Sequence, residues 1–422
     1  MRLLIIGLLV GLVLGVVVGA RYIGPDMIRS AQPIADVPQP DPEEIAEVVA
    51  EALPEALPTP ETQTVPVKAK TVEIAVAGSL PRAYPVYTTV VAHLESLPPV
   101  ISDGKLVLTY TEEAAFPVPQ ALLEAVAEGK LQAALGDPAL WGPEVPALYL
   151  FGGIPFGPTA SEILAWLNHG GGGEIHDRIY HAMGVHAVVC GVEAPRGGGW
   201  FRQRILSLDT LDGKTVAIEG PGAWVLESFG IDAVPLDLPG IFTAMESGQI
   251  VGAFHGSPAV DRTLQLHRVA RNLHMPGWHR QSGLIELILN LETWEGLSAT
   301  DRSRIESVCA ASVRATISAS EAGQYAALSK LEEEGARVQR WPAEVLTRLE
   351  QRWLEIAKSR ANSNPDFGAV WNSLQDFRKQ HQVWQNLGYV QKPALQAKPA
   401  PTDPVNPTPQ NTLEKKPALP AN

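Results

Sequence analysis

Two segments of this chain whose first residues lie 119 positions apart follow one residue pattern. Leu122 to Leu135 reads LLEAVAEGKLQAAL, and Ile241 to Phe254 reads IFTAMESGQIVGAF. Each begins as an apolar helical stretch, is stopped by a glycine (Gly129 or Gly248), and continues as a short alternating strand. Because one helix-to-strand unit is used twice, the sequence predicts a fold made of two similar halves.

Further strand candidates precede both copies of this pattern. Lys105 to Tyr110 and Ala233 to Leu236 come shortly before the two helices, and VEIAVAG from Val72 and KTVAIEG from Lys214 come earlier, each followed by a helical stretch. Both halves therefore have the order strand, helix, strand, helix, strand, which predicts parallel sheets with helices on both faces. Two such sheets joined by crossing strands leave a cleft between two lobes.

The later part of the chain is predicted to be helical. Ala299 to Glu334 has few helix breakers and an alanine-rich, charged pattern, and further helices are expected over 343–360 and 367–387, each after a proline. We expect these helices to pack across the back of both lobes. The predicted fold class is α/β, with a change of lobe near 190–196 and a return near 280–292.

The N-terminus carries a membrane-targeting segment. Residues 3–20, LLIIGLLVGLVLGVVVGA, contain no charge and lie between Arg2 and Arg21. About 27 Å of helix, at about 1.5 Å per residue, would cross most of a bilayer. Residues 1–21 are therefore a signal anchor in the inner membrane or a signal peptide cleaved after Ala20, and both export the remainder to the periplasm.

The composition of two further segments predicts disorder. Residues 22–70 are rich in proline and acidic side chains and form a linker, and residues 392–422 are a proline-rich tail. The folded, functional part is expected to span residues 71–391.

Several classes of protein are excluded by composition and motifs. A formal net charge of −13 argues against nucleic-acid binding. Cys190 and Cys309 are too few for a disulfide-dense scaffold or a four-cysteine zinc site, and they pair once or not at all. The glycine run 170–173 lacks G-K-[ST], and Ser257 lies in H-G-S-P-A with no neighbouring acid apparent to orient His255. We expect no enzyme and no cofactor.

Several stretches, in one order, resemble a known family. They are FGGIPFG (151–157), WLNHGGGGE (166–174), GGGWFR (197–202), LDTLDGKTVAIEGPG (208–222) and MPGWH (275–279). Together they resemble the extracytoplasmic solute-binding subunits of tripartite ATP-independent periplasmic (TRAP) transporters, DctP type, and most of all the branch that binds 2-keto acids. The resemblance runs from about Val72 to about Tyr389.

This resemblance implies a two-lobed periplasmic binding protein-like fold, type II-like, with long bridging helices and a ligand closed between the lobes. It also implies that the chain captures a small organic acid in the periplasm and hands it to TRAP permease subunits. Members of the family catalyse no bond chemistry.

The ligand-holding residues of the family are not preserved here. The resemblance places the carboxylate-binding arginine of the keto-acid branch at Ala217, and the ligands of its bound cation at Arg196, Phe254, His255 and Arg280. A hard cation needs several oxygen donors, and two arginines would repel it. We therefore expect no bound metal.

These substitutions predict a rewired anion site. Loss of one arginine and a cation, with gain of two arginines, keeps the positive charge that an anion site needs. Arg196 and Arg280 are expected to reach the cleft from opposite sides and clamp a carboxylate. The expected flanking side chains are Trp200, Phe254, His255, Trp278 and Trp224.

A structural interpretation stands beside this one. Each arginine is then a surface cation paired with Glu193, Glu219 or Glu286, and the aromatic side chains are ordinary core. Arg202 belongs to the family segment itself and is either a ligand contact or a structural bridge between the lobes.

A different class of function is also open. An exported, anchored chain that has lost its ligand-holding groups could be an accessory or scaffold subunit of a membrane complex that binds no solute. The state of the cleft discriminates the two functions. A polar pocket lined by arginines favours the receptor, and a cleft plugged by Phe254 and Trp278 favours the scaffold.

Overall fold

The computed structural model describes residues 71–390 except 79, 81, 83 and 113–118. The predicted anchor at 3–20, the linker at 22–70 and the tail at 392–422 lie outside the described residues. Within the described part of the chain, no helix has the length and apolar character needed to span a membrane.

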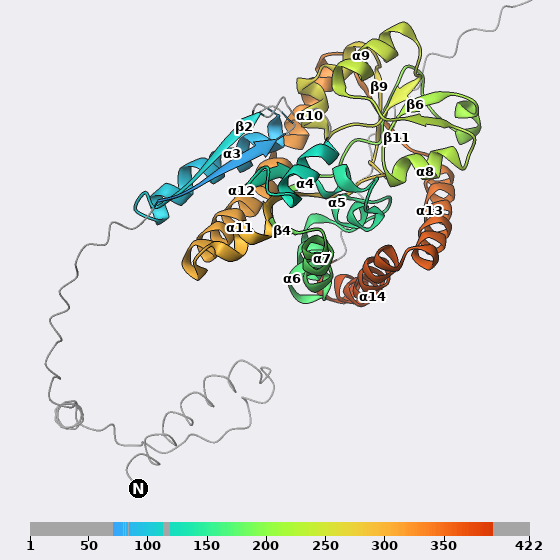
Figure 1. Ribbon diagram of the computed structural model, residues 1–422. Helices are drawn as coiled ribbons and strands as arrows, with labels where there is room; N and C mark the ends of the chain where they lie inside the picture. Colours follow the sequence, from blue (N-terminus) through green and yellow to red (C-terminus); the bar gives the residue numbers. More distant parts are fainter. Residues whose placement is uncertain (1–70, 79, 81, 83, 113–118, 391–422) are drawn as a thin grey trace, which may run out of the picture. The chain divides into compact units, whose positions relative to one another are not determined.

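Two β-sheets form the framework (Figure 1). The first sheet has the strand order β2-β1-β3-β10-β4, and its strands are β1 (Val72–Gly78), β2 (Leu106–Glu112), β3 (Ala133–Gly136), β4 (Val185–Glu193) and β10 (Gly283–Asn290). The second has the order β11-β9-β5-β8-β6-β7, and its strands are β5 (Trp200–Phe201), β6 (Thr215–Ala217), β7 (Asp232–Val234), β8 (Gly252–Ala253), β9 (Asn272–Met275) and β11 (Arg337–Arg340). We call the regions around them the first and second lobes.

The repeated pattern produces the same local topology in both lobes. In the first lobe, β1 pairs in parallel with β2 and β3, and in the second, β6 pairs in parallel with β7 and β8. The intervening helices are α3 (Pro85–Ile101) and α4 (Pro119–Ala127) in one half, and α8 (Pro221–Glu227) and α9 (Leu238–Ser247) in the other. Gly129 and Gly248 follow α4 and α9 with φ of 72° and 80°, a backbone conformation that favours glycine. The predicted two-lobed α/β fold class is confirmed.

The first sheet is completed by two strands, β4 and β10, whose connections cross between the lobes. β10 runs antiparallel between β3 and β4. The chain leaves the first sheet after β4 and returns to it at β10, and these two connections are hydrogen-bonded to each other, since the Arg196 amide donates to the Arg280 carbonyl at 3.1 Å. Between α4 and β4 lie η2 (Pro138–Trp141), α5 (Tyr149–Gly152), α6 (Ala160–His169) and α7 (Gly172–Ala182).

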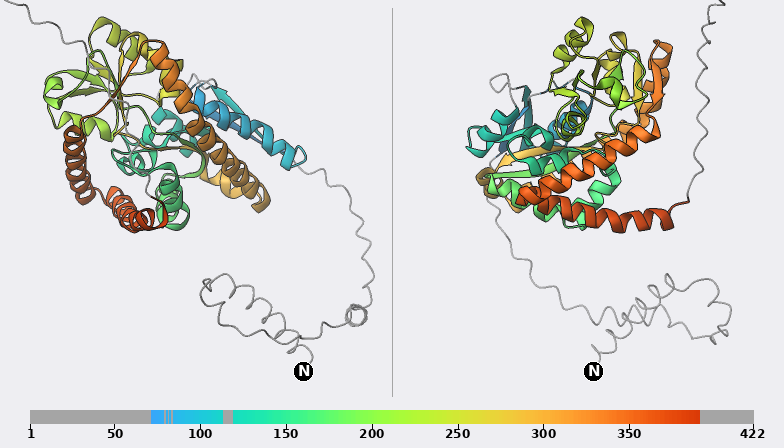
Figure 2. Two further views of the ribbon diagram at one scale, coloured as in Figure 1. Left: turned by 180° about the vertical axis from the view of Figure 1, so that it is seen from behind. Right: turned by 90° about the vertical axis from the view of Figure 1, so that its right-hand side faces the viewer.

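The long helix α12 (Ala299–Glu333) contacts both lobes (Figure 2). It packs against α3 and β4 of the first lobe, and against α10 (Pro258–Thr263) and β11 of the second. A disulfide joins Cys190 on β4 to Cys309 on α12. The sequence had left open whether these two cysteines pair. The short helix α11 (Leu291–Gly296) lies between β10 and α12 in the chain.

Two C-terminal helices connect the lobes a second time. α13 (Ala343–Ser363) packs on α8 of the second lobe, and α14 (Pro365–Gly388) packs on α6 and α7 of the first (Figure 1). Leu349, Trp353 and Leu374 are among their buried residues and join the same apolar core as Trp166 of α6. The predicted long helices across both lobes are thus present.

Candidate functional site

A cavity of about 580 Å³ lies between elements of the two lobes. The first lobe contributes Ala139 and Leu140 of η2 and Tyr149 of α5 to its wall. The second lobe contributes the loop after β6 and the start of α8, from Ile218 to Trp224, and α13 contributes Arg360. We call this cavity the cleft.

Arg196 and Arg280 both line the cleft. Each comes from one of the two crossing connections, which place them as neighbours rather than on opposite sides, so that part of the prediction is wrong. Nη2 of Arg196 and Nη2 of Arg280 lie 3.2 and 3.0 Å from the same atom, Oε2 of Glu193. Arg280 Nη2 also lies 2.5 Å from Oδ2 of Asp137. Two arginines and two carboxylates therefore meet at one edge of the first sheet, where β3 and β4 end and β10 begins.

Two glycines make room for the Arg280 side chain. A Cβ on Gly153, which has φ of 115° and belongs to the FGGIPFG segment, would lie 2.7 Å from Cγ of Arg280. A Cβ on Gly283 would overlap the guanidinium of Arg280 itself. The backbone is thus shaped around this arginine, which is 5% exposed.

The charges in this cluster cancel. Burial opposes the charged forms of Arg196 and Glu193, but their mutual attraction dominates, so the pKa of Arg196 is raised and the pKa of Glu193 is lowered. Burial raises the pKa of Asp137 against the pull of Arg280. Because each guanidinium already has a carboxylate, the pair offers a ligand hydrogen-bond donors but no net positive charge. The pairing with Glu193 in the structural interpretation is therefore found, but between largely buried side chains beside the cleft rather than at the surface.

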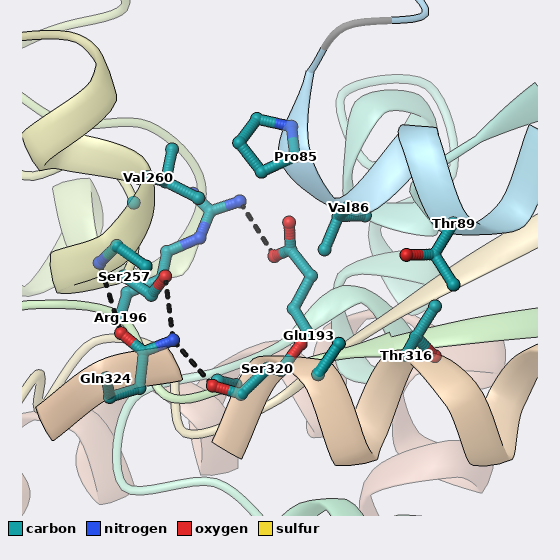
Figure 3. Close-up of a pocket in the computed structure, with 14 residues that line it drawn as sticks. Pro85, Val86, Thr89, Glu193, Arg196, Ser257, Val260, Thr316, Ser320 and Gln324 are labelled. Atoms are coloured by element: carbon teal, nitrogen blue, oxygen red, sulfur yellow. Dashed lines mark hydrogen bonds and ion pairs between the residues drawn. The ribbon is translucent and has the colours of Figure 1, made fainter. Parts of the chain in front are cut away.

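A smaller cavity of about 170 Å³ lies among α3, α10 and α12 (Figure 3). Arg196 and Glu193 line it, so Arg196 borders both cavities. On its α12 side, the amide of Gln324 donates to the hydroxyl of Ser257 at 3.4 Å and to the carbonyl of Ser320 at 2.6 Å. α3 belongs to the first lobe and α10 to the second, so this cavity also lies between elements of the two lobes.

The predicted aromatic residues divide into two groups. Phe254 and Trp224 line the cleft. Trp200 and Trp278 do not line it, because both are fully buried in the core. The indole nitrogen of Trp200 donates to Oδ2 of Asp261 at 2.8 Å, and the Trp278 ring packs behind Phe254 with ring centroids 5.8 Å apart. Trp200 and Trp278 thus support the wall without forming it.

Two predicted polar residues also have structural partners. Arg202 donates to the carbonyls of Met245 and Glu246 at the end of α9, so it joins two elements of the second lobe rather than the two lobes. Nδ1 of His255 lies 3.1 Å from Oδ1 of Asp261. The expectation that no acid orients His255 is therefore wrong. Neither Arg202 nor His255 lines the cleft.

Among the residues of the cleft wall that sequence reasoning missed are His279, Tyr149 and Arg360. His279 ends the MPGWH segment that carried the resemblance, so its position could have been found there. Tyr149 precedes the FGGIPFG segment by two residues. Arg360 has no sequence signal, because it lies in a helix whose pattern gives no indication of a neighbouring cavity.

His279 is a neutral, unpartnered side chain in this wall. It is 7% exposed, and neither ring nitrogen has a hydrogen-bond partner among the described residues. Burial, followed by the charges of Arg196 and Arg280, lowers its pKa well below the ordinary value. A neutral imidazole has one donor and one acceptor. Burial raises the pKa of Tyr149 to about 12, so its hydroxyl is also a neutral donor.

The cleft does not fit a metal ion. Across the described residues, no group of three or more His, Cys, Asp or Glu side chains could hold one. Asp137 and Glu193 are the buried carboxylates at this place, and the guanidinium of Arg280 already lies between them. A metal would have to displace that guanidinium against the charge of Arg196.

Comparison with known proteins identifies the family. The model of the DctP family, described as bacterial extracellular solute-binding protein, family 7, matches residues 76–363, more than half of the chain. The chain belongs to this family. As a DctP-family member of TRAP type it is a solute-binding protein, which confirms the resemblance seen in the sequence.

Its relatives include a curated protein and solved structures. The monocarboxylate 2-oxoacid-binding periplasmic protein of Nostoc sp. is 25% identical over 266 residues, 63% of this chain and 73% of that protein. A TRAP solute-binding protein of Bordetella bronchiseptica, with calcium and picolinate, is 25% identical with a TM-score of 0.72 over 75% of this chain and 95% of its own. One from Colwellia psychrerythraea, with calcium and pyruvate, is 22% identical with a TM-score of 0.72 over 75% and 97%, which supports the fold.

Proposed function

We propose that this DctP-family protein captures a small carboxylate in the cleft, without a metal ion, and delivers it to a TRAP permease. The observation that carries the proposal is the open cleft of about 580 Å³, whose wall contains Arg196, Arg280 and Arg360. Arginine forks suit planar carboxylates, and pockets of about 300 to 1,000 Å³ suit small ligands. The proposal contains no chemical step.

Two relatives support the class of ligand. The Nostoc relative is named for monocarboxylate 2-oxoacids, and the Bordetella bronchiseptica protein holds picolinate, an aromatic monocarboxylate. The neutral donors His279 and Tyr149 add hydrogen bonds for an oxo or hydroxyl oxygen next to the carboxylate.

The scaffold alternative is not favoured. It requires a cleft plugged by Phe254 and Trp278, but Phe254 forms part of the wall of an open cavity, and Trp278 lies in the core behind it. A surface-docking subunit would also have no need for three arginines facing one hollow.

Binding is tested directly on the purified full-length chain. Thermal unfolding and calorimetry are run with pyruvate, 4-methyl-2-oxopentanoate, phenylpyruvate, malonate and 2-oxoglutarate. A ligand at 100 times its Kd should stabilise the protein by about 2.7 kcal/mol. If none of these acids shifts the melting temperature or gives a binding isotherm, the receptor function is wrong.

The place of action is part of the proposal. Residues 3–20 export the chain to the periplasm and, if uncleaved, hold it at the inner membrane, close to a permease. Fractionation of the cells that express the chain tests this. Recovery in the membrane pellet, released by detergent and not by salt, supports the anchor, whereas recovery as a soluble periplasmic protein starting at Arg21 shows cleavage.

A further inference from the structure

Arg360 differs from the other two arginines of the cleft in having no carboxylate partner. Its guanidinium makes no ion pair and no hydrogen bond among the described residues, and its carbon Cζ lies 3.4 Å from the centroid of the Trp224 ring. Arg196 and Arg280, in contrast, are neutralised by Glu193 and Asp137. Arg360 is therefore the cleft arginine whose guanidinium has no paired carboxylate among the described residues, although Glu227 attracts it from a longer distance.

The position over Trp224 leaves the donors of Arg360 available. A guanidinium over an indole face keeps its N–H groups in its own plane, pointing past the ring. Burial lowers the pKa of Arg360, but a guanidinium stays charged at any physiological pH. The residue is half-buried, so part of its hydration is already removed before a ligand arrives. An anion in the cleft would meet a charged, pre-positioned fork.

Aromatic and apolar groups surround this charge. The Tyr149 ring meets the Trp224 ring edge-on, with centroids 5.2 Å apart, so residues of both lobes form one aromatic wall. The rest of the nearby lining is largely aliphatic and includes Leu140, Pro143, Ile218, Ala223, Ala233 and Pro235. A volume of about 580 Å³ exceeds what a three-carbon acid fills.

The balance of charge limits the ligand to one carboxylate. A second carboxylate would find Arg196 and Arg280 already occupied by Glu193 and Asp137. Elsewhere in the lining it would meet the exposed side chains of Glu219 and Glu227. A dianion therefore gains little over a monoanion and has an additional charge to desolvate.

We propose that Arg360 binds the ligand carboxylate and that Trp224 and Tyr149 hold a branched or aromatic substituent, so that the cleft selects apolar monocarboxylates over dicarboxylates. This inference rests on the proposed receptor function. In this proposal the carboxylate is bound by a residue of α13, near the C-terminus, and not at the family position. That position is occupied by Ala217, which is buried in the core of the second lobe.

The test compares two arginines of the same helix. Arg360→Met removes the proposed anchor. Arg352→Met is the matched control, because Arg352 also lies on α13 and over an aromatic ring, Phe229, at 5.7 Å, but does not line the cleft. Calorimetry of the full-length wild type and both variants uses phenylpyruvate, 4-methyl-2-oxopentanoate, malonate and 2-oxoglutarate.

Wild type should bind phenylpyruvate or 4-methyl-2-oxopentanoate at least about 10-fold more tightly than either dicarboxylate. Arg360→Met should weaken that binding by about 10- to 100-fold, and Arg352→Met should leave it unchanged. Arg360→Lys keeps the positive charge but loses the two-pronged guanidinium, so it should weaken binding by about 10-fold. This variant replaces Arg360→Met in the test if the Met variant does not fold.

The possible failures are distinguishable. Unchanged affinity in Arg360→Met, or in Arg360→Lys if only that variant folds, overturns the anchor and leaves the receptor function standing. Tighter binding of a dicarboxylate by the wild type overturns the selectivity. A wild type that binds none of the four acids overturns the inference together with the proposed function.

Discussion

Arg280 Nη2 lies 2.5 Å from Oδ2 of Asp137, and both side chains are almost fully buried. Removing one partner of a buried pair leaves an uncompensated charge, which typically costs about 3 to 5 kcal/mol. Because removal of Arg280 leaves Asp137 and Glu193 with the charge of Arg196 alone, we expect Arg280→Met to lower the free energy of unfolding by about 3 kcal/mol in urea titrations. Glu355→Gln, which breaks the exposed pair with Arg352, should change it by less than about 1 kcal/mol. Equal effects of the two variants would contradict the role of this pair.

Ligand binding should not depend on a metal ion. The guanidinium of Arg280 lies between Asp137 and Glu193, so these carboxylates have no charge left for a cation. We expect the Kd for a bound carboxylate to be the same in chelator as in added calcium or sodium salts at equal ionic strength. Calorimetry measures it, and a Kd that rises on chelation and recovers with calcium would disprove metal-free binding.

His279 should contribute to ligand binding rather than to stability. Both its ring nitrogens are buried without partners among the described residues. We expect His279→Phe to weaken carboxylate binding by about 10-fold while the melting temperature stays equal or rises, because unsatisfied polar atoms are removed. His93→Phe, on α3 and outside the cleft lining, is the control. A large loss of stability without loss of affinity would assign His279 a structural role.

The buried pair of His176 and Glu286 should make stability depend on pH. Burial by itself lowers the pKa of His176, but the charge of Glu286 and hydrogen bonds to Asp177 and Glu286 outweigh it and raise the pKa to about 9 from 6.5. Because the folded-state pKa is the higher one, the stabilisation is complete below about pH 6.5 and is lost as the pH rises through about 9.

We therefore expect the free energy of unfolding to fall by about 3 kcal/mol more in the wild type than in His176→Gln between about pH 6 and pH 9.5. Urea titrations across this range measure the difference. His181→Gln, an exposed residue on the same helix, should follow the wild type. Parallel profiles for wild type and His176→Gln would show that the pair does not titrate in this range.

The disulfide between Cys190 and Cys309 should stabilise the packing of α12 on the first sheet. It closes a loop of 119 residues, for which the chain-entropy model gives about 4 to 5 kcal/mol. We expect reduction, or replacement of both cysteines by alanine, to lower the free energy of unfolding by an amount of this order while ligand Kd is unchanged. No shift in the denaturation midpoint on reduction would contradict the bond.

Local sequence patterns were sufficient for the architecture. Gly129 and Gly248 follow two equivalent helices, and both have the positive φ that favours glycine at a helix end. The helix and strand patterns on either side of them can be recognised from residues only a few positions apart. Such signals predict parallel βαβ units and hence two lobes. Arg196 and Arg280 were expected at the cleft because the resemblance matched them to the cation ligands of the keto-acid branch, and the structure places both in the lining of the cleft.

The pairing of charges was decided by the tertiary structure. Asp137 and Arg280 are 143 residues apart, and nothing in the sequence around either one indicates the other. The contact between Asp261 and His255 was also missed, although only six residues separate them. The turn into α10 brings the two side chains together, and residue periodicity does not predict such a turn.

By itself the sequence predicted a two-lobed α/β fold of the solute-binding family, and it left open whether the cleft binds a solute. Only the tertiary structure decided which cleft arginine has no ion pair among the described residues, since Arg360 reaches the cleft through the packing of α13 on α8. The physical reason is that secondary structure is set by local backbone preferences. The net charge of a site depends instead on contacts between residues far apart in the sequence, which pair some charged side chains and leave others unpaired.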